Sequence, residues 1–150
     1  MKKTQKKLGN KGFSLVELIV VIAIMAVLVG VLAPTLIKNI EKSREAKDAQ
    51  NCDQIKSAVE IALQNEAAYA KNVPTGDTPK PLVTIESSTN ATDVVIATDA
   101  GTDFTTEFKG QINTDKTKLT SKKYKALTIT ITVDNKGQVE VKETAKTDGE

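Results

Sequence analysis

One apolar stretch near the N-terminus limits what this chain can fold into. Twenty uncharged residues run without interruption from Leu18 to Ile37, and a single carboxylate, Glu17, stands directly before them. At 1.5 Å rise per residue, a helix of this length extends about 30 Å, roughly the hydrocarbon thickness of a bilayer. The stretch is therefore predicted to span a membrane as a helix.

The segment before the apolar run is short and basic, with no acidic residue; its lysines are Lys2, Lys3, Lys6, Lys7 and Lys11. This order is typical of a secretory signal peptide, but the apolar run is too long and no small-residue cleavage site follows it. The only cleavage-like feature, Gly12, precedes the run. Cleavage there would remove residues 1–12 and leave the apolar helix on the mature chain. Basic residues before the span and mixed charges after it predict a cytoplasmic N-terminus and a head on the outside.

The residues at this junction read Lys11-Gly12-Phe13-Ser14-Leu15-Val16-Glu17 and lead into the apolar run. This sequence resembles the class III signal of type IV pilins and their relatives. The resemblance lies mostly within residues 1–37 and rests on a specific motif. It implies that a prepilin peptidase cuts between Gly12 and Phe13 and then methylates the new amino group of Phe13.

Glu17 is the main candidate for a functional side chain. A carboxylate at the edge of an apolar helix costs about 2.5–3.5 kcal/mol on insertion scales and usually has a partner. Cleavage would leave an α-amino group on Phe13, one helical turn away, and the amine that pairs with Glu17 would belong to the same subunit or to a neighbour in a filament. The resemblance favours the neighbour. The alternative is that Glu17 is a solvated residue at the level of the lipid headgroups.

Gly30 and Pro34 interrupt the otherwise strong helical pattern of the span. Proline removes a backbone hydrogen bond and costs about 3 kcal/mol in a helix interior, although neighbouring groups compensate for this in a bilayer. In a bundle of packed helices the same weakness would permit local bending or melting during assembly, as the resemblance implies. A tolerated kink is the other interpretation.

The remaining residues, 38–150, are enough for one small domain with its own core. Residues 38–71 contain neither glycine nor proline and are predicted to be helical. An apolar stripe suited to packing on a sheet is formed by Cys52, Ile55, Val59, Ala62 and Leu63. The charged segment 41–51 lacks such a stripe, and we expect it to rise from the membrane through water before the head begins.

The rest of the head is predicted to be a loop followed by short strands. The loop is Asn72–Pro81. Strands are expected at 82–86, 93–98, 124–133 and 138–142, the last two joined by a turn at 134–137, whereas 104–112 is ambiguous. This order predicts the α+β class, with a long N-terminal helix packed on a small antiparallel β-sheet. The resemblance implies the pilin αβ-roll.

Other residues give weaker signals. Cys52 is one of a kind in the chain, so no intrachain disulfide can form, which suits a Gram-positive-type pilin. We expect its thiol to be a small buried group rather than a reactive one. Asp93, Asp99 and Asp103 lie close in sequence, but their spacing matches no calcium loop, so solvated loop acids are expected instead. The pattern Asn90-Ala91-Thr92 is a weak glycosylation signal.

A basic run is formed by Lys116, Lys118, Lys122, Lys123 and Lys125. These lysines could touch DNA, acidic glycans or a surface, or they could be a solvated stretch leading into an edge strand that lysines protect from aggregation. We expect the solvated stretch. Without the leader, 16 basic and 19 acidic residues remain, a formal net charge of −3. This charge gives no general reason to bind nucleic acid, and no specific nucleic acid is predicted.

The chain has no histidine, no glycine-rich phosphate loop and no zinc-ligand spacing, so we predict no enzyme, no cofactor and no metal site. The predicted function is structural: a type IV pilus subunit that polymerises through its apolar helix into a surface filament for adhesion, motility or biofilm formation. Its expected partners are itself, the prepilin peptidase, an assembly platform with its ATPase, and the membrane before assembly. The alternatives are a minor pilin or type II secretion pseudopilin, and a membrane-anchored binding module that never polymerises.

Overall fold

A computed structural model describes residues 12–87, 92–113 and 117–146. The chain divides into two structural units, Met1–Asn39 and Ile40–Glu150. Helix α1, Leu15–Ala62, contributes residues to both units. The second unit contains all the other helices and strands of the described chain, and we call it the head.

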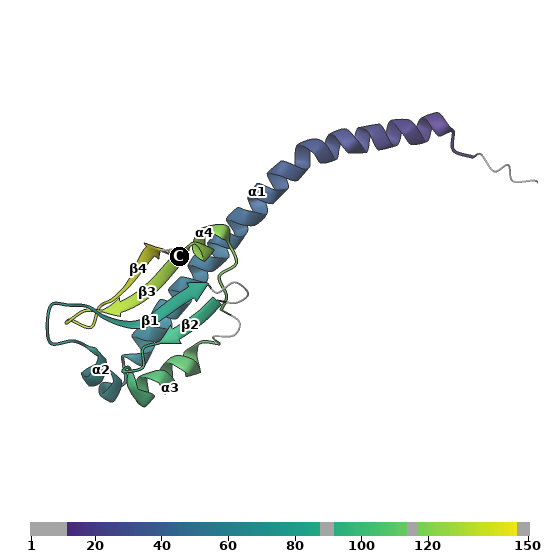
Figure 1. Cartoon of the computed structure of the whole chain (residues 1–150). Helices are drawn as coiled ribbons and strands as arrows, with labels where there is room; N and C mark the ends of the chain where they lie inside the picture. Colours follow the sequence, from purple (N-terminus) through teal and green to yellow (C-terminus); the bar gives the residue numbers. More distant parts are fainter. Residues whose placement is uncertain (1–11, 88–91, 114–116, 147–150) are drawn as a thin grey trace, which may run out of the picture. The chain divides into compact units, whose positions relative to one another are not determined.

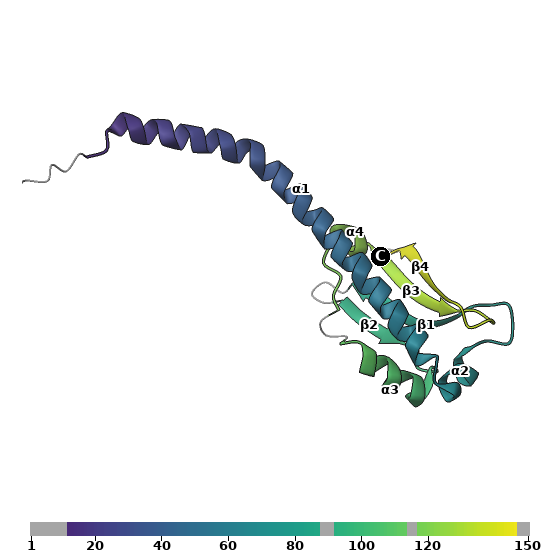
Figure 2. The same cartoon turned by 180° about the vertical axis from the view of Figure 1, so that it is seen from behind.

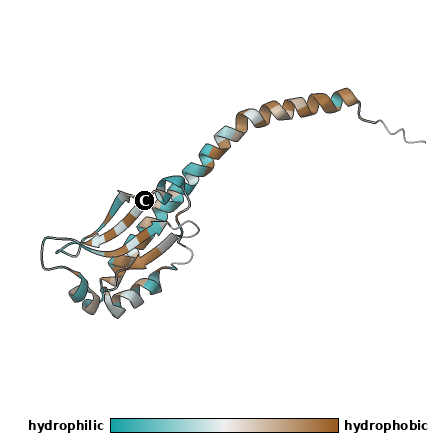
Figure 3. Cartoon of the chain, in the orientation of Figure 1, coloured by the Kyte–Doolittle hydropathy of each residue, from teal (hydrophilic) through white to brown (hydrophobic). Residues whose placement is uncertain are grey.

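In the first unit, α1 remains helical through Gly30 and Pro34. The large apolar side chains between Leu15 and Ile37 are all exposed in the single chain. In Figure 3 the ribbon of this part of the helix is coloured mostly as hydrophobic. It is the helix in the described part of the chain that is long and apolar enough to cross a membrane.

The head contains a four-stranded antiparallel sheet with the order β2-β1-β3-β4 (Figure 1). Its strands are β1 (Lys80–Ser87), β2 (Thr92–Ile96), β3 (Leu127–Val133) and β4 (Val139–Ala145). The predicted hairpin is confirmed, because β3 pairs with β4 from Val133↔Val139 to Leu127↔Ala145. Strand β1 reaches the centre of the sheet by pairing with β2 on one side and β3 on the other.

The C-terminal part of α1 lies across one face of this sheet (Figure 2). The predicted stripe is buried there, and Ile55, Val59 and Ala62 are completely inaccessible. They share one hydrophobic core with Leu82, Ile85, Ile129 and Ile131 of the sheet. A helix with one apolar stripe and strands with one apolar face bury those surfaces against each other. This arrangement confirms the predicted α+β fold of a long helix packed on a small antiparallel sheet.

The ambiguous segment 104–112 is helical and belongs to α3, Gly101–Gln111. Phe104 and Phe108 lie one turn apart on its buried face, with ring centroids 5.9 Å apart, and neither ring is accessible to solvent. Gly101, with a φ of 86°, starts the helix in a conformation that favours glycine. Two aromatic residues at a spacing of four therefore fit a helix that closes one side of the core.

The prediction of one helix through residue 71 is wrong, because α1 ends at Ala62 and a second helix, α2, spans Glu66–Asn72. The separation is caused by Asn65, whose side chain accepts hydrogen bonds from the backbone N–H groups of Ala67 and Ala68 at 3.0 and 3.3 Å. Asparagine is among the best residues for capping a helix N-terminus. Asn65 takes an extended conformation in that role, and this ends the first helix.

Two further boundaries differ from the prediction. Residues Lys122–Lys125 form a single helical turn, α4, so the strand expected from residue 124 begins only at Leu127. The cause is again a cap, since Ser121 Oγ accepts a hydrogen bond from the N–H of Tyr124. Pro81, expected in the loop, lies in β1 next to an irregularity in its pairing with β3.

Candidate processing and assembly site

The predicted cleavage sequence lies just outside the first helix. Gly12, Phe13 and Ser14 have no regular secondary structure, and α1 begins at Leu15. Phe13 is 85% exposed. A peptidase requires a peptide bond that is accessible and not held in a helix. The Gly12–Phe13 bond meets both conditions.

The side chains of Ser14 and Glu17 both accept hydrogen bonds from backbone N–H groups at the start of α1. The backbone N–H of Ser14 donates a hydrogen bond of 2.8 Å to Glu17 Oε2, and Ser14 Oγ accepts one of 3.3 Å from the N–H of Val16. The Glu17 bond is the glutamate half of a capping box, and Ser14 caps the N–H of Val16, the second residue of the helix, so each side chain satisfies one unpaired donor. The carboxylate also lies at the positive end of the helix dipole.

The spacing Ser-x-x-Glu before an apolar run is a known signal for the start of a helix. The capping role of Glu17 could therefore have been predicted from the sequence, but our sequence reasoning missed it. The capping bond uses the amide N–H of Ser14, which cleavage at the Gly12–Phe13 bond leaves intact. Cleavage would add a cationic amino group at Phe13, the neighbouring residue. Glu17 would then have two competing donors close to the start of its helix, its own cap and an ammonium group.

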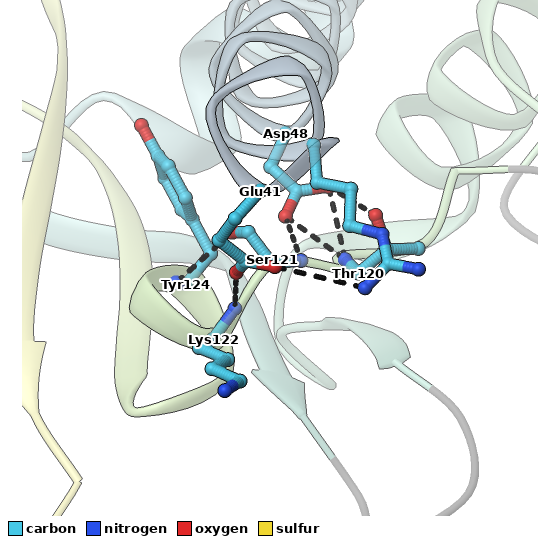
Figure 4. Close-up of polar contacts among 7 residues, drawn as sticks. Glu41, Asp48, Thr120, Ser121, Lys122 and Tyr124 are labelled. Carbon is cyan, nitrogen blue, oxygen red and sulfur yellow. Dashed lines mark hydrogen bonds and ion pairs between the residues drawn. The ribbon is translucent and has the colours of Figure 1, made fainter. Parts of the chain in front are cut away.

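A second polar cluster, which the sequence reasoning also missed, joins α1 to the head (Figure 4). Asp48 is fully buried. Its carboxylate accepts hydrogen bonds from the backbone N–H of Thr120, at 2.9 Å, and from that of Ser121, at 2.7 Å. We call Asp48 with Thr120 and Ser121 the Asp48 anchor. Because a charged acceptor strengthens a hydrogen bond, the anchor fixes the segment before α4 to the helix.

Two neighbours of Asp48 on α1 extend this junction. Glu41 accepts a hydrogen bond from the backbone N–H of Lys122, and Asn51 Nδ2 donates one of 3.0 Å to the carbonyl of Lys118. The expectation that residues 41–51 cross water before the head begins is therefore wrong. The physical reason is that polar side chains of this segment bond to backbone groups of residues 118–122. The face of α1 that contacts the rest of the head therefore extends beyond the apolar stripe and is polar there.

A signal for the anchor did exist in the sequence. Asp48 lies four residues before Cys52 and seven before Ile55, which places it on the same helix face as the apolar stripe. A carboxylate at a core position requires partners, because an unpaired buried charge is very costly. The sequence could not identify Thr120 and Ser121 as those partners, since they lie about seventy residues away.

Cys52 is a free, buried thiol, as expected. Burial raises the pKa of the Cys52 thiol to about 12, and nearby carboxylates, that of Glu143 first among them, add to the effect. The folded head therefore favours the neutral thiol over the thiolate. The thiol therefore makes its full contribution to stability below about pH 9, and that contribution is lost as the pH rises toward 12.

We expect Cys52 of the native protein to react with Ellman's reagent at pH 8 at least tenfold more slowly than Cys52 of the protein in urea. The reason is that thiolate is the reactive form and both burial and the raised pKa suppress it. The release of thionitrobenzoate, followed with and without denaturant, measures the ratio. Equal rates in the two conditions would contradict the assignment of Cys52 as a core residue.

The weaker candidate residues do not form a common site. Asp99 pairs with Lys80 at 3.0 Å, and the hydrogen bond from Lys80 lowers the pKa of Asp99. Asp103 lies in the first turn of α3. Within the described ranges no three acidic, cysteine or histidine residues gather closely enough to hold a metal ion. Asn90 and Ala91 of the glycosylation pattern, and Lys116, lie outside the described residues.

The described lysines of the basic run, Lys118, Lys122, Lys123 and Lys125, are all exposed. The expectation that they lead into an edge strand is wrong, because the strand that follows them, β3, lies between β1 and β4. Lys123 Nζ lies 5.2 Å from the centre of the Tyr124 ring, whose pKa burial raises. The protection of an edge strand therefore does not explain this run.

Comparison with known proteins matches the same N-terminal region. The model of the family described as "Prokaryotic N-terminal methylation motif" matches residues 7–33. The chain is also 43% identical over 63 residues to the prepilin peptidase-dependent protein A of Clostridium perfringens (strain 13 / Type A). That match covers 41% of this chain and 44% of the relative, so the chain spans less than half the length of the curated protein it matches. No solved structure matches the chain.

The matched region contains the Gly12–Phe13 bond, which lies outside any helix, and the helix start capped by Ser14 and Glu17. It also contains most of the exposed apolar run. The C-terminal part of the same helix packs on a small antiparallel sheet, consistent with a pilin fold. The motif and the apolar helix support a precursor anchored in a membrane by α1. The chain therefore carries the prokaryotic N-terminal methylation motif at residues 7–33, and it is similar over 63 residues to a prepilin peptidase-dependent protein.

Proposed function

We propose that this protein is the subunit of a type IV pilus. In this proposal, prepilin peptidase cleaves the chain between Gly12 and Phe13 and methylates the amino group of Phe13. The mature subunits then leave the membrane and polymerise through the apolar part of α1 on a platform protein driven by an ATPase. The name of the Clostridium perfringens relative supports the dependence on the peptidase.

The observation that carries the proposal is the exposed apolar surface of α1 between Leu15 and Ile37. Such a surface is stable only in lipid or against other apolar helices. Before assembly the bilayer would cover it. In the filament the same helices of neighbouring subunits would replace the lipid, and the heads would form the outer surface that adheres to other cells or materials.

Processing tests the first step. We expect the protein sheared from intact cells to begin at Phe13 and to carry one methyl group on its amino terminus, as read by N-terminal sequencing and mass spectrometry. Gly12→Val should leave the leader on the chain, since a branched side chain replaces hydrogen beside the scissile bond. The matched control is Gly110→Ala, at an exposed position on α3 where an added Cβ meets no atom within 4 Å; this variant should be processed normally.

Electron microscopy tests the second step and separates the alternatives. Long surface filaments built of this chain would support a major pilin. Short or absent filaments with normal processing would favour a minor pilin or a type II secretion pseudopilin. An uncut monomer that is found only in membranes would overturn the proposal and leave a membrane-anchored binding module.

A further inference from the structure

The strongest unexplained feature of the head is a basic surface around α4. Segment 117–126 carries Lys118, Lys122, Lys123 and Lys125 and no acidic residue, and all four side chains are exposed. The neighbouring turns of α1 add Lys42, Arg44 and Lys47, which are also exposed. We call these seven residues the basic end of the head. The same turns of α1 also hold Glu41, Glu45 and Asp48, so this end has a formal net charge of +4. Residues 40–150 have 15 basic and 18 acidic residues, −3 in all, which leaves −7 on the rest of the head.

The basic end is connected to the apolar run by a short stretch of chain. Glu41 of α1 accepts a hydrogen bond from the backbone of Lys122, and the Asp48 anchor lies two helical turns further along. Glu41 lies only four positions after Ile37, where the apolar run ends. Whatever direction the chain takes between them, four residues reach at most about 14 Å. When the apolar run occupies a bilayer, the lysines around Lys122 therefore lie close to the headgroups.

The two carboxylates that contact this segment, those of Asp48 and Glu41, bind its backbone N–H groups. Asp48 is buried and accepts from the backbone N–H groups of Thr120 and Ser121. Glu41 accepts from the backbone of Lys122 and pairs with Arg44 at 3.6 Å. In Figure 4 the side chain of Lys122 extends away from α1 and from both carboxylates. The acids therefore fix the segment in place and leave its ammonium groups available to solvent.

We propose that, while the precursor is anchored in the membrane, the basic end of the head binds the anionic headgroups of phospholipids in the leaflet on its own side. This inference rests on the membrane-anchored precursor and does not require polymerisation. An anionic bilayer attracts a lysine at its surface by roughly fivefold in association per residue, and the attraction falls off over about 10 Å. The acidic remainder of the head is repelled by the same surface. Together the two effects would hold the head in one orientation until the subunit is extracted.

Lysine footprinting of the full-length chain in vesicles tests the proposal. The chain is reconstituted with phosphatidylcholine alone or with seven parts phosphatidylcholine and three parts phosphatidylglycerol. Each vesicle is treated with a membrane-impermeant acetylating reagent, and the modified lysines are read by mass spectrometry. We expect Lys122, Lys123 and Lys125 to react at least threefold more slowly in the anionic vesicles, and 0.5 M NaCl to abolish the difference. Lys109 and Lys136, exposed elsewhere on the head, are internal controls and should not change.

Paired variants show which lysines select the lipid. The readout is the preference of the chain for spin-labelled phosphatidylglycerol over spin-labelled phosphatidylcholine. Lys122→Gln with Lys125→Gln should reduce this preference at least threefold, whereas Lys109→Gln with Lys136→Gln, which removes the same charge, should leave it unchanged. Equal footprints in the two vesicles, or equal effects of the two double variants, would overturn the proposal. Protection that appears in phosphatidylcholine and rises with protein density would also overturn it, because a second copy of the chain would then be the occupant.

Discussion

Filaments are expected to be lost, at least tenfold in number per cell, when Glu17 is replaced by alanine. The variant should still enter the membrane, because removing a carboxylate lowers the cost of inserting the helix. If the carboxylate of Glu17 pairs with the amino group of Phe13 on a neighbouring subunit, as the resemblance to type IV pilins implies, the variant lacks this charge pair and assembly should fail. Electron microscopy of whole cells, together with an immunoblot of membrane and sheared fractions, measures both effects.

The capping box makes a sharper test possible. In Glu17→Gln the side chain can still accept the hydrogen bond from the Ser14 N–H, so the helix start survives while the charge is removed. Ser14→Ala does the reverse, since it removes the cap on Val16 and keeps the carboxylate. If assembly requires the charge of Glu17, Glu17→Gln should form as few filaments as Glu17→Ala, and Ser14→Ala should form filaments normally. Normal filaments from Glu17→Gln would refute the charge pairing and leave helix capping as the role of Glu17.

Replacing Asp48 by alanine is expected to lower the free energy of unfolding of the head by about 3 kcal/mol. The change removes a buried acceptor and leaves the backbone N–H groups of Thr120 and Ser121 without it, and each buried polar group left unpaired costs about 1–3 kcal/mol. Urea unfolding of the full-length chain in a mild detergent, followed by tyrosine fluorescence, measures the loss.

The matched control for Asp48 is Asp53, an exposed acid five residues further along the same helix. Asp53→Ala removes the same charge and should change the free energy of unfolding by less than about 0.5 kcal/mol, as is usual for surface substitutions. If both variants unfold at the same urea concentration, Asp48 does not anchor the helix to the segment before α4. A loss at Asp48 that greatly exceeds the loss at Asp53 would support the anchor.

Most residues of the candidate site could be proposed from the sequence because they are close together in it. Gly12, Phe13 and Glu17 lie within six residues, and a helix converts such spacings directly into positions. The structure added the bonds between Ser14 and Glu17, which follow from the same local spacing. The apolar stripe at Ile55 and Val59 was equally local, since a periodicity of three to four residues needs no knowledge of the partner sheet.

The errors have local and long-range causes. The break after Ala62 and the turn at Lys122–Lys125 depend on the caps Asn65 and Ser121, two small polar residues in segments otherwise rich in helix or strand formers. In such segments a cap worth about 1 kcal/mol decides where an element begins. The role of Asp48 depends instead on residues at the other end of the head, which a helical pattern does not reveal.

By itself the sequence determined the apolar helix, its processing signal and the α+β class, because periodicity and motif spacing act over a few residues. The tertiary structure alone decided that Asp48 is buried rather than exposed to water, that β3 is central, and that the backbone of Lys122 in α4 bonds to Glu41 of α1. Each of these facts is a contact between residues about seventy or more positions apart, or a pairing of distant strands. Such contacts form when the whole core closes, since the burial of apolar surface that stabilises them is shared by all the elements at once.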